Sequence, residues 1–253
     1  MSGLFDLTGR LAVVTGATRG IGAAAAVALA AAGADVVGLG STRPPGDDVA
    51  DAVRAHGRTF EGLAADLSDR AAVQQLAADL ARRERPIDVL VNNAGTIRRE
   101  PAVSHSLADW DEVLAVDLTS QFVLAQALGR SMVERGRGKI VFTASLLSFQ
   151  GGITVPGYAA AKHAVAGLTK ALANEWAPRG VNVNAVAPGY VATDNTQALR
   201  DDPDRSRSIL ERIPAGRWAS PQDIAGAVVY LASPAADYVH GVVLPVDGGW
   251  LAR

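Results

Sequence analysis

Short apolar runs alternate along the chain with longer alanine-rich or amphipathic segments. The apolar runs are continuous rather than alternating, which is typical of strands buried on both faces of a parallel sheet. Helical segments lie between them, such as the run that ends at Gly33 and the segment that begins at Arg70. The pattern predicts an α/β fold with a doubly wound parallel sheet of about seven strands and helices on both faces. The predicted strands are 11–16, 35–40, 58–66, 87–93, 138–145, 180–188 and 241–248.

The composition excludes several classes of function. The 253 residues are 49% hydrophobic and 20% charged, which is ordinary for a globular protein. The net charge of −2 gives no indication of a nucleic-acid or membrane-surface partner. The absence of cysteine excludes disulfides and thiolate catalysis. We find neither a signal segment nor an apolar stretch near the roughly 20 residues of a membrane span, so a cytoplasmic protein is expected.

A glycine-rich stretch, TGATRGIG at 15–22, joins the first predicted strand to the first helix. The glycines Gly16, Gly20 and Gly22 allow a tight turn and let the backbone approach a pyrophosphate, whose charge the helix N-terminus favours. Ordinary turns also collect glycine, but this one lies after the first strand of a βαβ unit. In that position the stretch predicts a dinucleotide site and therefore a Rossmann-type fold.

The chain shows no internal repeat and no low-complexity linker. We therefore expect residues 1–253 to form a single dinucleotide-binding and catalytic domain. The segment 190–220 is polar and contains several prolines, so it does not read as part of the sheet. Because it follows a strand end, where sheets of this kind bind ligands, it is predicted to be a substrate lid within that domain.

Tyr158 and Lys162 stand four residues apart in GYAAAKHA, 157–164. On a helix, residues with this spacing are neighbours on one face. Taken alone, the pair is simply a surface tyrosine lying along a lysine stem. The alternative is catalytic, because a nearby ammonium makes a phenol a better proton donor and acceptor near neutral pH.

Four motifs decide between these interpretations: TGATRGIG, NNAG at 92–95, Ser145 with Tyr158-x3-Lys162, and Pro188-Gly189. In this order and spacing they resemble the short-chain dehydrogenase/reductase family over nearly the whole chain. The resemblance implies that Tyr158 is the general acid/base, that Lys162 assists it and binds the nicotinamide ribose, and that Ser145 orients the substrate oxygen. The chemistry agrees, since hydride transfer from a nicotinamide leaves an alkoxide that needs a proton.

The resemblance also implies the cofactor contacts. Asp66 matches the acidic residue that contacts the adenine in relatives, although it could equally be a charge near a helix N-cap. The predicted cofactor-binding residues are Gly16, Thr18, Arg19, Gly20, Ile21, Gly22, Ser41, Thr42, Arg43, Asp66, Leu67, Asn92, Ala94, Gly95, Tyr158, Lys162, Pro188, Gly189, Val191 and Thr193.

One position departs from the family pattern. Many relatives have an asparagine on the fourth helix, in a pattern like Asn-x4-Phe, that holds a water of the proton relay. This chain has Asp117 five residues before Phe122. An aspartate can still bind that water, but it only accepts hydrogen bonds when ionised, and it adds charge beside Lys162. We count Asp117 with Ser145, Tyr158 and Lys162 as a predicted catalytic residue.

The end of the second predicted strand bears on the choice between NAD and NADP. A carboxylate there would bind the ribose 2′-hydroxyl and repel a 2′-phosphate. The chain reads GLGSTR at 38–43, with no acid. Arg43, which could also be a solvated loop charge, and Arg19 could receive a phosphate. We predict NADP, with NAD as the runner-up.

More particular stretches indicate the substrate class. They resemble the bacterial sugar-acid members of the family, the 2-deoxy-D-gluconate 3-dehydrogenases and gluconate 5-dehydrogenases. An aldonate needs a cation for its carboxylate, and a guanidinium can clamp a carboxylate with two parallel bonds. The stretches are IRRE (97–100), SFQGGI (148–153), ANEWA (173–177), APGYVATDNTQ (187–197), RIPAGRW (212–218) and VDGGWLAR (246–253), and the predicted substrate residues are Arg98, Arg99, Gln150, Asn195 and Arg217.

The sequence therefore predicts an NAD(P)-dependent oxidoreductase that interconverts a secondary alcohol and a ketone of a sugar acid. The runner-up is a 3-ketoacyl-thioester reductase, which shares the same catalytic set. A third possibility is a non-catalytic NAD(P)-binding sensor or scaffold, against which the retained Ser145, Tyr158 and Lys162 argue. No metal is expected, since a phenol supplies the proton. The resemblance implies a homotetramer.

Overall fold

A computed structural model describes residues 3–253 and shows one sheet of seven parallel strands. The strand order is β3-β2-β1-β4-β5-β6-β7, so the predicted doubly wound fold is confirmed. Each predicted strand is present, shortened by a few residues at most at either end. The strands are β1 (Leu11–Thr15), β2 (Asp35–Gly40), β3 (Phe60–Ala64), β4 (Val89–Asn92), β5 (Gly138–Thr143), β6 (Val181–Pro188) and β7 (Val243–Val246).

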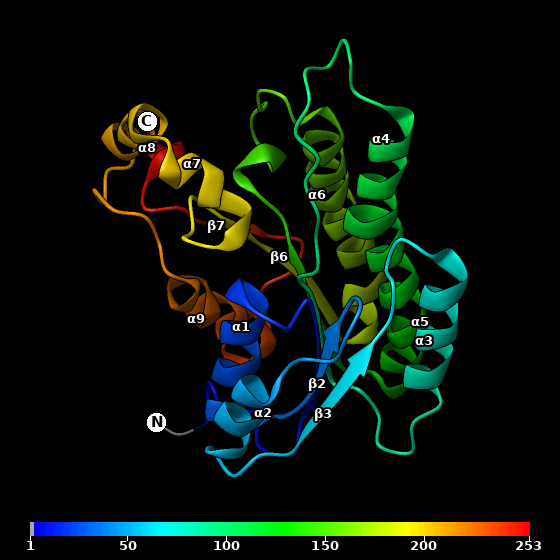
Figure 1. Ribbon diagram of the computed structural model, residues 1–253. Helices are drawn as coiled ribbons and strands as arrows, with labels where there is room; N and C mark the ends of the chain where they lie inside the picture. The colour runs from blue at the N-terminus through cyan, green and yellow to red at the C-terminus, as the bar shows by residue number, and fades with distance from the viewer. Residues whose placement is uncertain (1–2) are drawn as a thin grey trace.

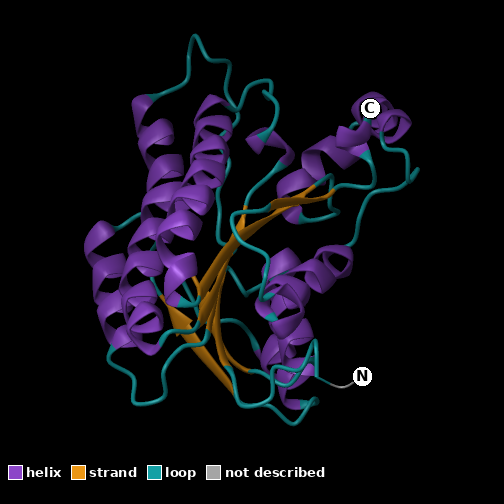
Figure 2. Cartoon of the chain, turned by 180° about the vertical axis from the view of Figure 1, so that it is seen from behind, coloured by secondary structure: helices purple, strands orange, loops and turns teal. Residues whose placement is uncertain are grey.

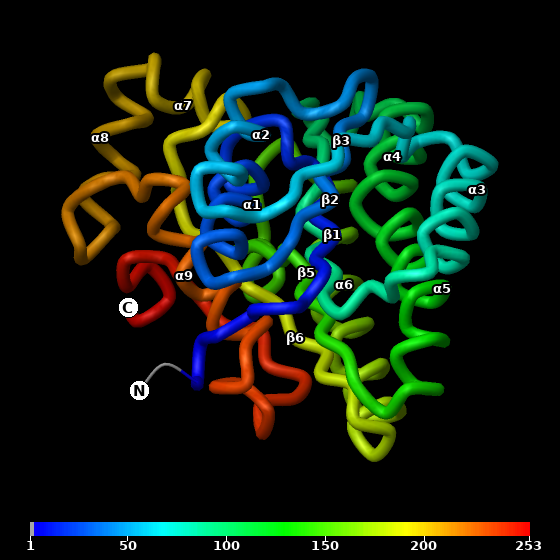
Figure 3. Tube along the Cα trace, turned by 90° about the horizontal axis from the view of Figure 1, so that it is seen from below, coloured from blue at the N-terminus to red at the C-terminus, as the bar shows by residue number. Residues whose placement is uncertain are grey.

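Helices cover both faces of the sheet. Helices α1, α2 and α9 lie on one side, and α3 to α6 lie on the other (Figures 1 and 2). The view from below shows the strands between these two layers (Figure 3). The helices are α1 (Gly20–Ala31), α2 (Asp47–Arg54), α3 (Arg70–Ala81), α4 (Leu107–Leu114), α5 (Ser120–Arg135), α6 (Pro156–Trp176), α7 (Gln197–Asp201), α8 (Pro203–Arg212) and α9 (Pro221–Ala232).

The continuous apolar character of the strands follows from this layering. In β1, Leu11 and Val13 pack into the core that includes α3, α5 and α6. Their neighbours Ala12 and Val14 pack into the opposite core, with α1 and α9. Because successive residues of a strand point to opposite faces, a strand buried on both sides needs an apolar residue at every position.

The sheet places the functional residues at one edge. The strand order reverses at β1, which pairs with both β2 and β4, and ligands bind such sheets outside the carboxyl ends of the strands at this reversal. Residues 190–220, predicted to be a lid, follow β6 and include α7 and α8, which lie together at the upper left of Figure 1, above α1 and α9. They share a small core with Leu146 and Trp250. Within residues 3–253, no helix is both long enough and apolar enough to cross a membrane.

Candidate active site

The loop after β1, residues 15–22, forms a tight glycine-rich turn, called here the glycine cradle. Gly16 has φ +66°, which side-chain-bearing residues rarely adopt. At Gly22 an added Cβ would lie 2.1 Å from the carbonyl oxygen of Gly16, so no other residue fits. The amide of Asn93 donates to the carbonyl of Thr15 at 3.0 Å, and the Thr15 hydroxyl accepts from the backbone amides of Asn93 and Ala94 at 3.0 and 2.9 Å. The sequence analysis missed Asn93, although it lies inside the NNAG motif and fixes the cradle.

The turn after β2 fits a phosphate better than a bare ribose. Ser41, Thr42 and Arg43 are all exposed there, and no acid occurs between Asp35 and Asp47. An added Cβ at Gly40 would lie 1.9 Å from the carbonyl oxygen of Arg43, so the turn folds tightly back over the end of β2. The turn therefore presents hydroxyls and a guanidinium at the place where a protein carboxylate would bind the ribose 2′-hydroxyl of NAD.

The strands beside β1 contribute two further predicted positions. The carboxylate of Asp66, just after β3, accepts from the hydroxyl and the backbone amide of Ser68 at 2.7 and 2.9 Å, and these bonds lower the pKa of Asp66. Its neighbour Leu67 is buried. At the end of β4, Asn92 is fully buried and donates to the carbonyl of Gln121 at 3.4 Å. Its Oδ1 has no hydrogen-bond partner among the described residues, so one acceptor remains open.

The loop after β6 lies against the glycine cradle. Gly189 passes so close to the residue after β7 that an added Cβ would lie 2.6 Å from the Cα of Asp247. A methyl group of Thr193 lies 3.4 Å from where a Cβ on Gly20 would be. Arg19 and Asp194 join the two loops by an exposed ion pair at 2.9 Å. The predicted cofactor residues from Pro188 to Thr193 therefore meet those of the glycine loop.

The predicted catalytic residues lie at the ends of two elements beside this cradle. Ser145 follows β5 and caps the short helix Leu146–Ser148, accepting from the backbone amide of Leu147 at 3.2 Å. Tyr158 lies in the first turn of α6. Both side chains line one cavity of about 590 Å³. Lys162 is buried one turn further on, with its Nζ 5.3 Å from the ring centroid of Tyr158.

Asp117 binds Lys162 directly. It lies in a single π-helical turn, Ala115–Thr119, between α4 and α5, and it is fully buried. Its Oδ2 lies 3.1 Å from Lys162 Nζ, and its Oδ1 accepts from the backbone amide of Thr96 at 2.7 Å. An added Cβ at Gly95 would lie 3.0 Å from Oδ2, so this glycine leaves room for the carboxylate. Such π turns occur frequently at functional sites.

Burial and the ion pair act together on the pKa of both groups. Burial raises the pKa of Asp117 and outweighs the opposing effects of Lys162 and of the Thr96 amide. Burial works the other way on Lys162, but the Asp117 carboxylate and Tyr158 outweigh it and raise the pKa of Lys162. Lys162 also donates to the carbonyl of Thr143 at 2.9 Å. On acidification Asp117 gains a proton, whereas the ammonium beside Tyr158 persists well above neutral pH.

The predicted substrate residues separate into two groups. Arg99, Gln150 and Asn195 line the cavity with Tyr158. Arg98 and Arg217 do not line it. Arg98 binds Glu112 through two bonds of 2.8 and 2.6 Å, and Arg217 binds Asp223 through two bonds of 2.7 and 2.8 Å.

Two arginines that the sequence analysis missed also line the cavity. Arg205 and Arg212 come from α8, together with Ser208 and Ile209. Their spacing of i, i+3, i+4 and i+7 is that of one helix face, which was a detectable signal within the segment predicted to be a lid. Among the described residues that line the cavity, three are arginines and none is acidic.

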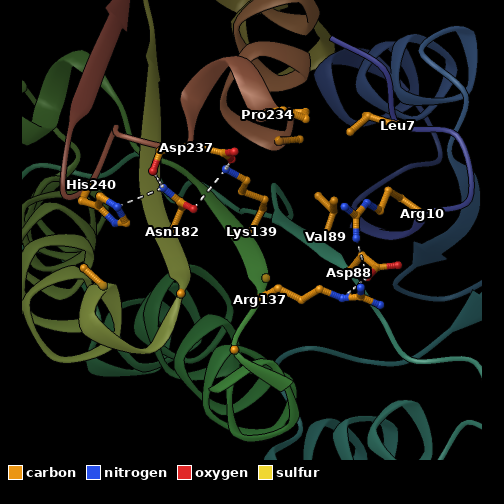
Figure 4. A pocket seen from close by; sticks show the side chains of 15 residues that line it. Leu7, Arg10, Asp88, Val89, Arg137, Lys139, Asn182, Pro234, Asp237 and His240 are labelled. Carbon is orange, nitrogen blue, oxygen red and sulfur yellow. Dashed lines mark hydrogen bonds and ion pairs between the residues drawn. The ribbon is translucent and has the colours of Figure 1, made fainter. Parts of the chain in front are cut away.

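A second cavity, of about 380 Å³, lies at the opposite edge of the sheet. Its charged side chains bind one another (Figure 4). Lys139 donates to Asn182 at 3.0 Å and to Asp237 at 2.6 Å, while Arg10 and Arg137 lie 3.4 and 3.9 Å from Asp88. Neither this cavity nor any other place in residues 3–253 brings together three or more histidine or acidic side chains able to hold a metal ion.

The chain is similar to known proteins over nearly its whole length. Residues 16–251 match the family model described as enoyl-(acyl carrier protein) reductase. The chain is 55% identical to a 2-dehydro-3-deoxy-D-gluconate 5-dehydrogenase from Pseudoalteromonas atlantica over 250 residues, which are 98% of each chain. It is also 55% identical to a candidate NAD(P)-dependent gluconate 5-dehydrogenase from Beutenbergia cavernae solved with bound NADP. That match covers 99% of this chain and 100% of the other, with a TM-score of 0.95.

A third match has a small acid bound. A gluconate 5-dehydrogenase from Burkholderia cenocepacia, in complex with NADP and tartrate, is 38% identical to this chain. The match covers 100% of this chain and 99% of the other, with a TM-score of 0.92. Family and fold are therefore established over nearly the full length of the chain.

Proposed function

Because this chain belongs to the short-chain dehydrogenase/reductase family, we propose that it is an NADP-dependent oxidoreductase that interconverts a secondary alcohol and a ketone of a sugar acid. We propose C5 of a gluconate-type acid as the reacting carbon, since relatives that share 55% and 38% of the sequence are named for that position. NAD is the alternative cofactor.

The observation that carries the substrate class is the charge of the cavity beside Tyr158. Arg99, Arg205 and Arg212 line it, and none of its described lining residues is acidic. A guanidinium binds a carboxylate through two parallel, charge-assisted bonds, so an anionic substrate is favoured over a neutral one. Gln150 and Asn195 offer further donors and acceptors for the hydroxyls of a sugar chain.

We assign each role in the reaction to a residue of this chain. The glycine cradle and the Ser41–Arg43 turn would hold NADP, which would supply or accept the hydride when bound. Tyr158 exchanges the proton with the substrate oxygen, and Ser145 orients that oxygen. Lys162 holds positive charge beside the phenol, and Asp117 holds Lys162 in place. The backbone of residues 188–193 would contact the nicotinamide.

A substrate panel tests this assignment. We expect 2-dehydro-3-deoxy-D-gluconate and D-gluconate to be turned over with NADP, followed at the nicotinamide absorbance, and NAD to be the poorer cofactor. The description of the matching family model makes an acyl thioester the natural competitor. Rapid reduction of a 3-ketoacyl thioester, with no turnover of any sugar acid, would contradict the proposal. Cofactor binding without turnover of either class would favour a sensor or scaffold.

We further propose that residues 190–220 act as a substrate lid and that the enzyme is a cytoplasmic homotetramer. The position of α7 and α8 beside the cavity supports the lid. The family resemblance supports the tetramer, as do the exposed apolar side chains of Phe122, Phe149 and Ile153, which an interface could cover. Light scattering should give about four times the chain mass of 26.1 kDa, and a monomer would contradict the tetramer.

A further inference from the structure

One face of α8 presents two guanidiniums to the cavity beside Tyr158. Arg205 and Arg212 lie seven residues apart on this face. Arg207 lies on the same helix but does not line the cavity, and its guanidinium instead pairs with Asp204 at 3.6 Å. The helix therefore has cavity-facing and outward-facing arginines that can be compared directly.

Arg212 is the better fixed of the two cavity-facing arginines. Its guanidinium lies 4.0 Å from the ring centroid of Trp250, which is buried. Gln150 Oε1 accepts from Arg212 at 3.4 Å and from the indole N–H of Trp250 at 3.3 Å. An aromatic ring under a guanidinium fixes its plane and leaves its outer edge free to meet a carboxylate.

Residues 250–253 hold the last turn of α8 in place. Arg253 donates through Nε to the carbonyl of Arg212 at 3.1 Å, and through a second nitrogen to the carbonyl of Glu211. These are carbonyls that the helix end leaves without partners in the helix, and a cation there is favoured by the helix dipole. The turn that carries Trp250 is itself fixed, because Asp247 accepts from the backbone amides of Gly249 and Leu251 at 2.9 and 3.0 Å.

We propose that Arg212 binds the carboxylate of the substrate, and that Trp250 and Arg253 are positioning residues that aim its guanidinium. This inference deepens the proposed function and rests on it. Arg99 is less suited to this role, since it donates to the carbonyl of Asn195 at 3.0 Å and no aromatic ring of the described residues lies under its guanidinium, as Trp250 does under that of Arg212. Tyr158 on α6 and Arg212 on α8 come from different elements of the cavity, which suits a chain whose reacting carbon and carboxylate are at opposite ends.

Kinetics with a charged and a neutral substrate test the role of Arg212. For Arg212→Ala we expect KM for the sugar acid to rise roughly 10- to 150-fold, as loss of a charged hydrogen bond predicts. We expect kcat to change little, because the carboxylate is bound equally in the ground and transition states. With the amide of the same acid, wild type and variant should have the same KM. For Arg212→Lys, KM for the acid should lie between the values for wild type and Arg212→Ala, since an ammonium cannot form the bidentate bond.

Matched variants separate positioning from general damage. Arg207→Ala, on the outer face of the same helix, should leave both KM and kcat unchanged. Arg253→Ala should raise KM for the acid and not for the amide, and Arg253→Lys should restore part of the loss. Thermal unfolding of each variant checks the fold.

The results also separate this inference from the proposed function. If wild type turns over the sugar acid and Arg212→Ala keeps its KM, the assignment of Arg212 is wrong while the function stands. An equal loss on acid and amide would likewise overturn it. If wild type turns over no sugar acid, the proposed function itself fails.

Discussion

The two cavities at opposite edges of the sheet are both lined by cations, yet they differ in what those cations bind. At the amino edge, where the amino ends of the strands lie and the cavity of about 380 Å³ is found, Lys139 is bound to Asp237, and Arg10 and Arg137 lie beside Asp88. At the carboxyl edge, no described lining residue supplies an acid to the arginines beside Tyr158. Positive charge that the protein neutralises itself stabilises the fold, whereas charge left without a partner in a cavity favours an external anion.

Within the active site, paired charges and charges without an acidic partner also occur side by side. Asp117 and Lys162 are both buried and pair at 3.1 Å. The arginines of the cavity are exposed, and an anion can reach them. We therefore assign the paired buried charges to proton transfer and the exposed ones to substrate binding, and the following predictions separate these roles.

The largest effect should come from Tyr158→Phe. Removing the phenol removes the proton donor and acceptor, and general acid/base catalysis contributes about 10²- to 10⁴-fold in rate. We expect kcat to fall by that range, while the affinity for NADP, measured by calorimetry, stays within a few-fold of wild type. A variant with near-normal turnover would show that another group moves the proton.

Asp117→Asn should come next, with an effect on stability and on pH dependence. Breaking a buried ion pair destabilises a protein by roughly 3 kcal/mol or more, so denaturant unfolding should show a loss of that size. In wild type Asp117 raises the pKa of Lys162. The stability that the charged Lys162 gains from Asp117 is therefore present at neutral pH. It is lost only as the pH rises through the raised pKa of Lys162.

In the Asn variant the effect of burial is opposed only by Tyr158, so the pKa of Lys162 falls. The ammonium should then be lost at lower pH, and the alkaline limb of the kcat profile should move towards neutrality. Identical pH profiles for variant and wild type would mean that Asp117 has no influence on the proton relay.

Ser41→Asp should change cofactor preference by an intermediate amount. The new carboxylate would stand at the end of β2, where it favours a ribose 2′-hydroxyl and repels a 2′-phosphate. A charged hydrogen bond is worth about 1.5–3 kcal/mol, so the ratio of kcat/KM for NADP to that for NAD should fall roughly 10- to 150-fold. If the ratio does not change, the Ser41–Arg43 turn does not bind the 2′ position.

The smallest effect should come from the amino edge. Asp237→Asn removes one partner of a pair whose acid is largely exposed, and such pairs contribute about 0–1 kcal/mol. We expect a loss of unfolding free energy no larger than that, and unchanged kcat/KM for the sugar acid. A clear loss of activity would mean that the amino-edge cavity communicates with the site, and the contrast between the two cavities would fail.

Local patterns in the sequence were enough to predict the fold. Each predicted strand is confirmed because a doubly buried strand must be apolar at every position, which a single sequence displays directly. The predicted helix after Arg70 is α3, and the glycine loop lies where it was expected, between β1 and α1. Ser145 and Tyr158 are brought together because the end of β5 and the start of α6 meet at one edge of the sheet.

The substrate side was less predictable, because it depends on tertiary contacts. Arg98 and Arg217 look like Arg212 in the sequence, and only the positions of Glu112 and Asp223 show that the first two are already bound. The π turn that directs Asp117 inward has no sequence signature that we recognised. The conformation of Thr154, a cavity residue with φ +63°, likewise has no sequence signature, since β-branched residues rarely adopt it.

The most direct test of the central claim is a crystal structure of the enzyme with NADP and a gluconate-type acid. Our account predicts the acid in the carboxyl-edge cavity, with its C5 oxygen in hydrogen-bond reach of Tyr158 and Ser145 and its carboxylate on the guanidinium of Arg212. An acid bound in the amino-edge cavity, or one whose carboxylate points away from all three cavity arginines, would contradict it.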